Sequence, residues 1–197
     1  MPKIVDHEAK KEQIAGATWR VILRDGMKGA TVRGIAKEAG MSLGALRHYF
    51  STQDELLAYA MQLVRERATA RIERIANGDL PPKRKVLAIL SELVPLDEDT
   101  RAETEVWFAY VFSLGRRADS LHVQQDIYSG IRRIVQLLAQ HRLLRADLDL
   151  ELTAETLYAL VDGVAAHAFL EPSRLTKGTI AAVLSAYIDS IWTIEQP

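Results

Sequence analysis

The chain has 197 residues, 48% of them hydrophobic and 26% charged, a composition typical of a globular protein with a sizeable core rather than of a disordered chain. It contains no cysteine, which excludes disulfides, thiolate catalysis and cysteine metal ligands. The longest uninterrupted apolar run, Val106–Phe112, is far shorter than the roughly 20 residues that span a bilayer, and the N-terminus has no signal-peptide pattern. We therefore expect a cytoplasmic protein with no membrane partner.

The net charge of −1 is unevenly distributed along the chain. Residues 1–53 hold nine Lys/Arg and five Asp/Glu, a net charge of +4, whereas the remaining residues carry a net charge of −5. This asymmetry favours an N-terminal surface that contacts polyanions.

Apolar residues recur at helical spacing along nearly the whole chain, and no segment has the pattern of a strand. We therefore predict an all-α fold of about nine helices. The expected helices cover residues 7–25, 32–39, 43–49, 53–76, 85–94, 121–142, 153–170 and 176–194, with one more that starts at Thr100 and contains the aromatic segment 105–112. The pattern also predicts a domain boundary inside or just after the long fourth helix.

Local signals mark the ends of these helices. Several starts carry an N-cap residue, which in two cases forms a capping box with a glutamate three residues later, and two ends carry a C′ glycine. The predicted starts are at Thr31, at Ser42, at Thr52 with Glu55 and at Thr100 with Glu103, and the predicted ends are at Gly26 and Gly40.

The two short helices joined through "AGMS" have the spacing of a helix-turn-helix. Leu46 and Phe50 share a face with Ile35 and Ala39, so we expect these four side chains to be buried. The opposite face of the second short helix carries polar and small residues: Ser42, Leu43, Gly44, Arg47 and His48, with Tyr49 at its edge.

This exposed face has two interpretations. It is either a solvated polar face on a core helix or a surface that reads DNA. In the second case Arg47 reads a base edge, best guanine O6 and N7, while His48 and Tyr49 suit phosphate oxygens. The preceding capped helix and the local positive charge favour DNA reading.

Residues 29–57, "GATVRGIAKEAGMSLGALRHYFSTQDELL", resemble the DNA-binding signature of the TetR family of transcriptional regulators. The resemblance implies an all-α homodimer with a DNA-binding domain, residues 1–52, and a ligand-binding and dimerisation domain, residues 53–197. It also implies a repressor that a small-molecule effector releases from a pseudo-palindromic double-stranded operator. The matching positions are Thr31, Ile35, Ala36, Ala39, Gly40, Ser42, Gly44, Leu46, Tyr49, Phe50, Glu55 and Leu56.

Three positions depart from the commonest pattern of the family. Arg47 stands where tyrosine is frequent and Tyr49 where histidine is frequent, so that "RHYF" is closer to the BetI-type branch. The segment "TAETLYALVDGVAAHAFL" also resembles the regulatory domain of that branch. Gln53 replaces a lysine that commonly binds phosphate. The DNA-contacting set implied by the motif and the resemblance is Thr31, Arg33, Ser42, Leu43, Gly44, Arg47, His48, Tyr49 and Gln53.

Aromatic residues gather in the C-terminal half, and we expect most of them to be core. A helical cavity lined by aromatic residues with one carboxylate is nevertheless a reasonable effector pocket, and it would suit a cationic ligand through cation–π attraction. The plainer role for the carboxylate is an exposed charge, and the rival ligand is a neutral apolar one. The predicted pocket residues are Trp107, Tyr110, Tyr128, Tyr158 and Asp162.

The segments 153–170 and 176–194 carry more apolar residues than one packed side of a helix requires. We interpret the surplus as a subunit interface, although these residues could also merely close the ligand domain. The predicted interface residues are Leu157, Val161, Val164, Ile180, Leu184, Tyr187, Ile188 and Ile191.

Enzymatic function is not indicated. The five histidines form no metal-ligand cluster, and neither a glycine-rich phosphate loop nor a nucleophile elbow is present, so we expect no metal and no cofactor. Two rivals to the DNA-binding interpretation are a small-molecule carrier or enzyme with a degenerate helix-turn-helix and a protein–protein adaptor. A carrier or enzyme would need neither the helix cap at Ser42 nor the side chains of Arg47 and Tyr49, which argues against the first rival. An adaptor would expose an apolar helix, and only Leu43 supports it.

Overall fold

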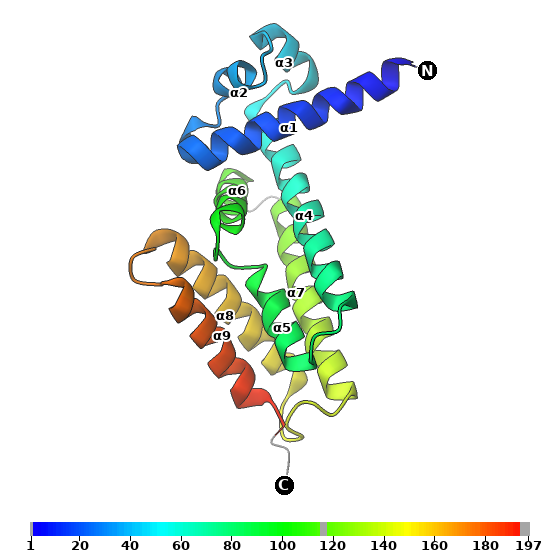
Figure 1. Cartoon of the computed structure of the whole chain (residues 1–197), viewed down its shortest axis with the longest axis vertical. Helices are drawn as coiled ribbons and strands as arrows, with labels where there is room; N and C mark the ends of the chain where they lie inside the picture. Colours follow the sequence, from blue (N-terminus) through cyan, green and yellow to red (C-terminus); the bar gives the residue numbers. More distant parts are fainter. Residues whose placement is uncertain (1, 115–117, 194–197) are drawn as a thin grey trace. The chain divides into compact units, whose positions relative to one another are not determined.

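The computed structural model describes residues 2–114 and 118–193, over which the chain forms nine helices and no strand (Figure 1). The predicted all-α fold is therefore confirmed. The helices are α1 (Pro2–Gly29), α2 (Val32–Glu38), α3 (Leu43–Tyr49), α4 (Gln53–Asn77), α5 (Pro82–Ser91), α6 (Glu98–Leu114), α7 (Ala118–Gln140), α8 (Leu150–Leu170) and α9 (Lys177–Ile191). None of the described helices is both long and apolar enough to cross a membrane.

The chain divides into two compact units. The N-terminal unit comprises Met1–Ala70 with Asp97–Gly115, and the C-terminal unit comprises Arg71–Leu96 with Arg116–Pro197. Helix α6 and most of α4 therefore group with α1–α3, a division that differs from a boundary at residue 52. The functional division into a DNA-binding and a regulatory domain stays a prediction.

In the N-terminal unit, α1 packs against α2 and also against α6 (Figure 1). Its apolar stripe is almost fully buried, which explains why a helix with so many charged residues is stable here. The regular helix breaks at Gly26, the predicted end, where a φ of +66° and a ψ of −175° are non-helical; the chain kinks there, and α1 continues to Gly29. The buried α1 residues are Ile14, Ala15, Ala17, Thr18, Trp19, Val21 and Ile22.

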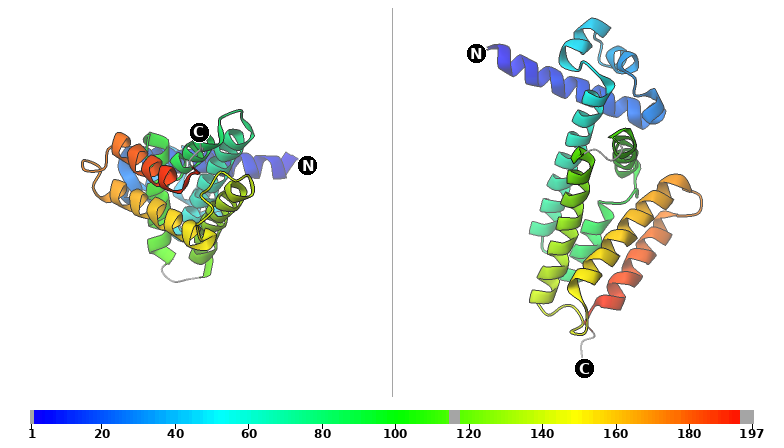
Figure 2. Two further views of the ribbon diagram at one scale, coloured as in Figure 1. Left: turned by 90° about the horizontal axis from the view of Figure 1, so that it is seen from below. Right: turned by 180° about the vertical axis from the view of Figure 1, so that it is seen from behind.

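In the C-terminal unit, α5, α7, α8 and α9 surround one hydrophobic core. Helices α8 and α9 lie side by side in both views of Figure 2, and α7 packs along α8. The chain end closes the unit, because Leu144 and Trp192 form an antiparallel bridge and the Arg145 amide donates to the Ile191 carbonyl at 3.1 Å.

The core of the C-terminal unit corrects the predicted subunit interface. Seven of the eight predicted interface residues expose at most 6% of their surface within a single chain and thus have no area left for a partner. The eighth, Tyr187, is half-buried and donates its hydroxyl to the Thr153 carbonyl at 3.1 Å. The seven core residues are Leu157, Val161, Val164, Ile180, Leu184, Ile188 and Ile191.

Aspartate caps shift two helix starts from their predicted places. Helix α6 begins at Glu98, not after Thr100, because Asp97 and Thr100 exchange hydrogen bonds between each backbone amide and the other side chain, at 2.8 and 3.0 Å. Helix α8 begins at Leu150, since Asp149 accepts from two first-turn amides at 2.9 and 3.1 Å. The predicted cap at Thr52 is confirmed, because its hydroxyl accepts from the Glu55 amide at 3.1 Å. The reciprocal bond of the predicted box is shifted by one residue, since the Glu55 carboxylate accepts from the Ser51 amide at 2.7 Å.

Candidate DNA interface

The turn between α2 and α3 depends on Gly40, whose positive φ allows the backbone to reverse and hydrogen-bond to the end of α2. Gly40 has a φ of +64°, and the Met41 amide reaches back to the Ala36 carbonyl at 2.9 Å. The next helix starts immediately, because the Ser42 hydroxyl accepts from the Ala45 amide at 3.1 Å. The predicted helix-turn-helix is therefore present.

The start of α2 is equally tight. Thr31 caps the helix by accepting from the Gly34 amide at 3.0 Å. A side chain at Gly34 would lie 2.9 Å from the Gly29 carbonyl oxygen, so the absence of one lets the helix lie directly against the end of α1.

The inward face of the helix-turn-helix was predicted correctly. Ile35, Ala39, Leu46 and Phe50 are each at most 5% exposed. Their burial turns the opposite faces of α2 and α3 outward. The exposed residues there are Thr31, Arg33, Lys37, Ser42, Gly44, Arg47 and His48, with Leu43 and Tyr49 half-buried.

Eight of the nine predicted DNA contacts thus lie on the surface formed by α2 and α3, and Lys37 adds a cation that was not predicted. Nothing lies within 4 Å of a side chain built at Gly44, which leaves the first turn of α3 open to a large ligand. A helix that exposes an arginine and a serine beside a half-buried tyrosine has the dimensions and donors needed in a DNA major groove.

The Tyr49 ring contacts the imidazole rings of two histidines. Its ring centroid lies 4.7 Å from that of His7 on α1 and 5.7 Å from that of His48 on α3. The contact with His7 was not predicted, because no local signal relates residues 42 positions apart. It fixes the phenol at the end of α3, where its hydroxyl can donate to a phosphate oxygen.

Gln53 has a structural bond in place of the phosphate-binding lysine of the family pattern. Its side-chain amide donates to the Ala30 carbonyl at 3.3 Å, tying the first residue of α4 to the loop before α2. The side chain remains exposed.

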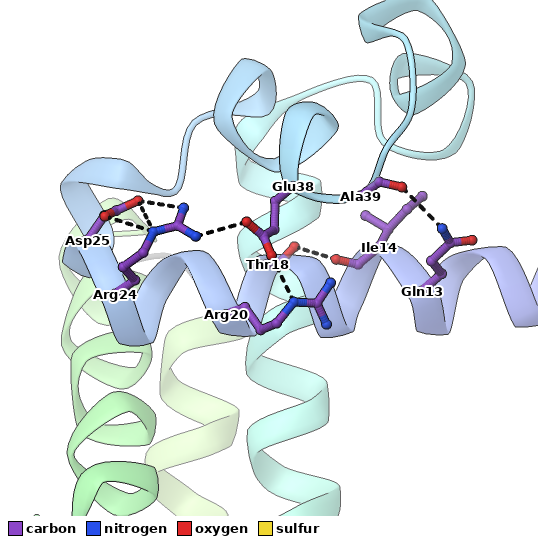
Figure 3. A network of polar contacts seen from close by, with 8 residues as sticks. All are labelled: Gln13, Ile14, Thr18, Arg20, Arg24, Asp25, Glu38 and Ala39. Atoms are coloured by element: carbon purple, nitrogen blue, oxygen red, sulfur yellow. Dashed lines mark hydrogen bonds and ion pairs between the residues drawn. The ribbon is translucent and has the colours of Figure 1, made fainter.

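Two arginines of α1 bind the one acidic residue of α2, an arrangement that the sequence analysis did not anticipate (Figure 3). These hydrogen bonds to Arg20 and Arg24 hold the pKa of the Glu38 carboxyl below its ordinary value. The i, i+4 spacing of the arginines was the available signal, since it places both on one helix face.

The predicted effector residues fall into both compact units. Tyr128 and Tyr158 meet edge to face with ring centroids 5.6 Å apart, and Asp162 is one turn from Tyr158 on α8. Trp107 and Tyr110 belong to α6 of the N-terminal unit, and their share in a common pocket stays a prediction.

Electrostatics distinguish the group in the C-terminal unit from ordinary surface residues. Burial raises the pKa of the Tyr158 phenol to about 12, and the negative charge of Asp162 adds to the shift. Burial also raises the pKa of Asp162 above its ordinary value, although interaction with the Tyr158 hydroxyl partly opposes this. Asp162 is thus partly withdrawn from water beside the Tyr158 phenol, not a fully solvated charge.

Comparisons with known proteins agree with this geometry. Residues 14–60 match the family described as bacterial regulatory proteins, tetR family, and residues 82–193 match the C-terminal domain of BetI-type transcriptional repressors. The HTH-type transcriptional regulator PksA of Bacillus subtilis (strain 168) is 54% identical over 192 residues, which cover 97% of this chain and 94% of that protein.

Solved structures share the fold. A transcriptional regulator from Rhodococcus sp. Rha1 superposes with a TM-score of 0.76 at 31% identity, covering 92% of this chain and 95% of its own. A regulator from Saccharomonospora viridis, crystallised in complex with choline, superposes with a TM-score of 0.82 at 20% identity, covering 95% of this chain and 100% of its own.

Together, the exposed helix-turn-helix and these matches define a DNA-binding transcriptional regulator, not an enzyme. The chain belongs to the TetR family, with a C-terminal domain of the BetI type.

Replacing Arg47 with alanine tests base reading. We expect the affinity for a specific site to fall by about 1–3 kcal/mol with a nearly unchanged salt dependence, because a base contact releases no phosphate counterion. Tyr49→Phe is expected to weaken all sequences by a similar factor. Fluorescence anisotropy with a specific and a shuffled duplex measures the affinities of both variants. Arg84→Ala, at an exposed position of α5, is the control for loss of one positive charge. Equal weakening of both duplexes by Arg47→Ala would make Arg47 a phosphate contact.

Replacing Gln53 with lysine tests whether this position faces phosphate. The variant loses the bond to Ala30 but gains a cation, so we expect tighter binding to every duplex. The slope of log K against log salt should steepen by about 0.9 for each phosphate neutralised. Gln62→Lys adds the same charge at another exposed position of α4 and serves as the control. An identical slope change in both variants would show that residue 53 does not contact the backbone.

Proposed function

We propose that this regulator is a repressor that binds a pseudo-palindromic operator as a homodimer in the cytoplasm and is released by a small-molecule effector. The observation that carries the DNA-binding part is the exposed face of α2 and α3, which combines Arg33, Lys37 and Arg47 with small or hydroxyl-bearing residues. Its short reading helix spans few base pairs, so specificity requires two copies about one helical turn of DNA apart.

The dimer is supported by a second apolar stripe on α8, opposite the stripe that faces the core. Its positions are spaced alternately by four and three residues, the repeat of a helix that packs against another helix. Leu152 and Leu170 at its ends are 65% and 70% exposed, and a side chain at Gly163 would meet nothing within 4 Å. The stripe comprises Leu152, Thr156, Ala159, Gly163, Ala166 and Leu170.

Helix α9 has a corresponding outward side made of small residues: Gly178, Ala181, Ala182 and Ala186. Small side chains allow the backbones of neighbouring helices to approach closely. Paired outward sides of α8 and α9 from two protomers would form a four-helix bundle, which is the interface that we propose in place of the buried set.

The test measures the molecular mass of the protein in solution and the DNA sequences that it selects from a random duplex library. We expect the wild type to have twice the mass of the 22.0 kDa chain and to enrich inverted repeats from a random duplex library. Ala159→Arg, at an exposed position of α8, should give monomer and lose the enriched site, because one reading helix then acts alone. Ala76→Arg, an exposed control on α4, should do neither. A monomeric wild type, or a library with no enriched sequence, would contradict the proposal.

The effector that the C-terminal unit suits best is a cation. The faces of Tyr128 and Tyr158 attract positive charge, and the ionised form of Asp162 supplies the counter-charge. The choline complex of the Saccharomonospora viridis regulator, which has the same fold, is consistent with this class of ligand. A neutral apolar ligand is the competing class, and for it a buried carboxyl is unfavourable.

Thermal unfolding distinguishes the two classes. Choline at one hundred times its dissociation constant should stabilise the protein by about 2.7 kcal/mol, and Asp162→Asn should remove most of this shift. Asp79→Asn in the exposed α4–α5 loop is the matched control. Because burial raises the pKa of Asp162, the choline shift should fade as the pH decreases through that raised value. No shift with choline, or an equal shift in Asp162→Asn, would exclude the cation.

A further inference from the structure

We propose that Glu38, Arg20, Arg24 and Gln13 form a polar clamp that positions the helix-turn-helix on α1 and so determines how well it distinguishes one DNA sequence from another. The proposal rests on the DNA-binding function proposed above. None of these four residues belongs to the predicted DNA-contacting set, and they act on recognition through α2.

Each carboxylate oxygen of Glu38 has its own guanidinium partner. Arg20 Nε donates to one oxygen at 2.8 Å, and Arg24 Nη1 donates to the other at 2.9 Å (Figure 3). Asp25 orients the second arginine by accepting from its Nε and Nη2 at 2.9–3.2 Å. Because both oxygens are engaged from different turns of α1, the carboxylate cannot rotate or slide without breaking a bond.

A neutral bond fixes the same end of α2. The Gln13 side-chain amide donates to the Ala39 carbonyl at 3.1 Å (Figure 3). Gln53 holds the opposite end of the helix through the Ala30 carbonyl, at 3.3 Å. The seven residues of α2 are thus tied at both ends by side chains from α1 and α4.

The clamp can position α2 because the helix buries few apolar side chains of its own. Only two side chains within the helix are buried, Ile35 and Ala36, so few apolar side chains fix its rotation on α1. The directional hydrogen bonds of the clamp restrict the rotation and position of α2 further. The arginine side chains are 57% and 59% exposed and that of Glu38 is 22% exposed, so water screens the ion pairs from the arginine side and their main effect is on orientation rather than on folding.

The orientation of α2 passes to α3 through the short turn. The Met41 amide is bonded to Ala36, and Ser42 caps the next helix at once, so a rotation of α2 moves Arg47 with it. Base contacts require hydrogen bonds of correct length and angle, whereas phosphate contacts by flexible cations tolerate displacement. Loosening the clamp should therefore reduce specific binding more than non-specific binding.

The test compares two changes at Glu38 that differ in charge. Glu38→Gln removes the negative charge, whereas Glu38→Asp keeps it but shortens the arm that reaches both arginines. Glu12→Gln, at an exposed position of α1, makes the same charge change away from the clamp. The probes are the duplex that the wild type enriches from a random library and a shuffled duplex of the same composition.

We expect both Glu38 variants to lower the ratio of the two affinities by about fivefold or more, the lower end of what one good base contact contributes. The melting temperature should fall by no more than about 2 °C, since the ion pairs are exposed. Amide exchange over residues 31–42 should accelerate. Glu12→Gln should raise both affinities together and leave the ratio and the exchange unchanged.

An unchanged affinity ratio in both Glu38 variants would overturn the clamp as a determinant of specificity. If the glutamine variant unfolds, the aspartate variant alone decides, because it preserves the charge. If the wild type enriches no sequence, the proposed function fails, and the clamp is then judged by amide exchange: unchanged exchange over residues 31–42 overturns it, and faster exchange supports it.

Discussion

The DNA-binding end of this protein depends on the packing of α2 against α1 and of α3 against α2. Two seven-residue helices bury only a few apolar side chains, while fixing each residue costs about 1–2 kcal/mol of backbone entropy. Such helices are also far shorter than the roughly 12 residues at which isolated helices become marginally stable. The helix-turn-helix therefore exists only as part of a unit in which α1 supplies the missing surface.

Helix α1 can serve this role because it is buried on more than one side. It packs against α2 and also against α6, which the chain places between two segments of the C-terminal unit. The N-terminal unit thus continues covalently into the C-terminal unit through α4 and through both ends of α6.

Local signals accounted for what could be predicted from the sequence. The caps at Thr31 and Ser42, the left-handed Gly40 and the buried Leu46 and Phe50 depend on neighbours a few residues away, so pattern alone sufficed. Aspartate caps were missed where a threonine or an acidic run offered a competing signal, as before α6 and α8.

Tertiary partners could not be predicted in the same way. Periodicity showed that α8 and α9 each have an excess of apolar residues, but it could not show which stripe faces the chain's own core. Leu157 and Leu184 were therefore assigned to the wrong side. The bonds from Gln13, Gln53 and Arg24 were missed for the same reason, because each joins residues that are at least 14 positions apart.

The charge of the reading surface is modest, and this has a consequence for selectivity. Helices α2 and α3 expose three cations, Arg33, Lys37 and Arg47, and Gln53 at the start of α4 contributes an amide in place of a further cation. Each phosphate contact strengthens binding to every sequence alike, whereas base contacts strengthen only the correct one. A surface with few cations loses total affinity but little of its preference for a site. Discrimination then depends on the accuracy with which Arg47 is presented, and that accuracy is set by the side chains holding α2.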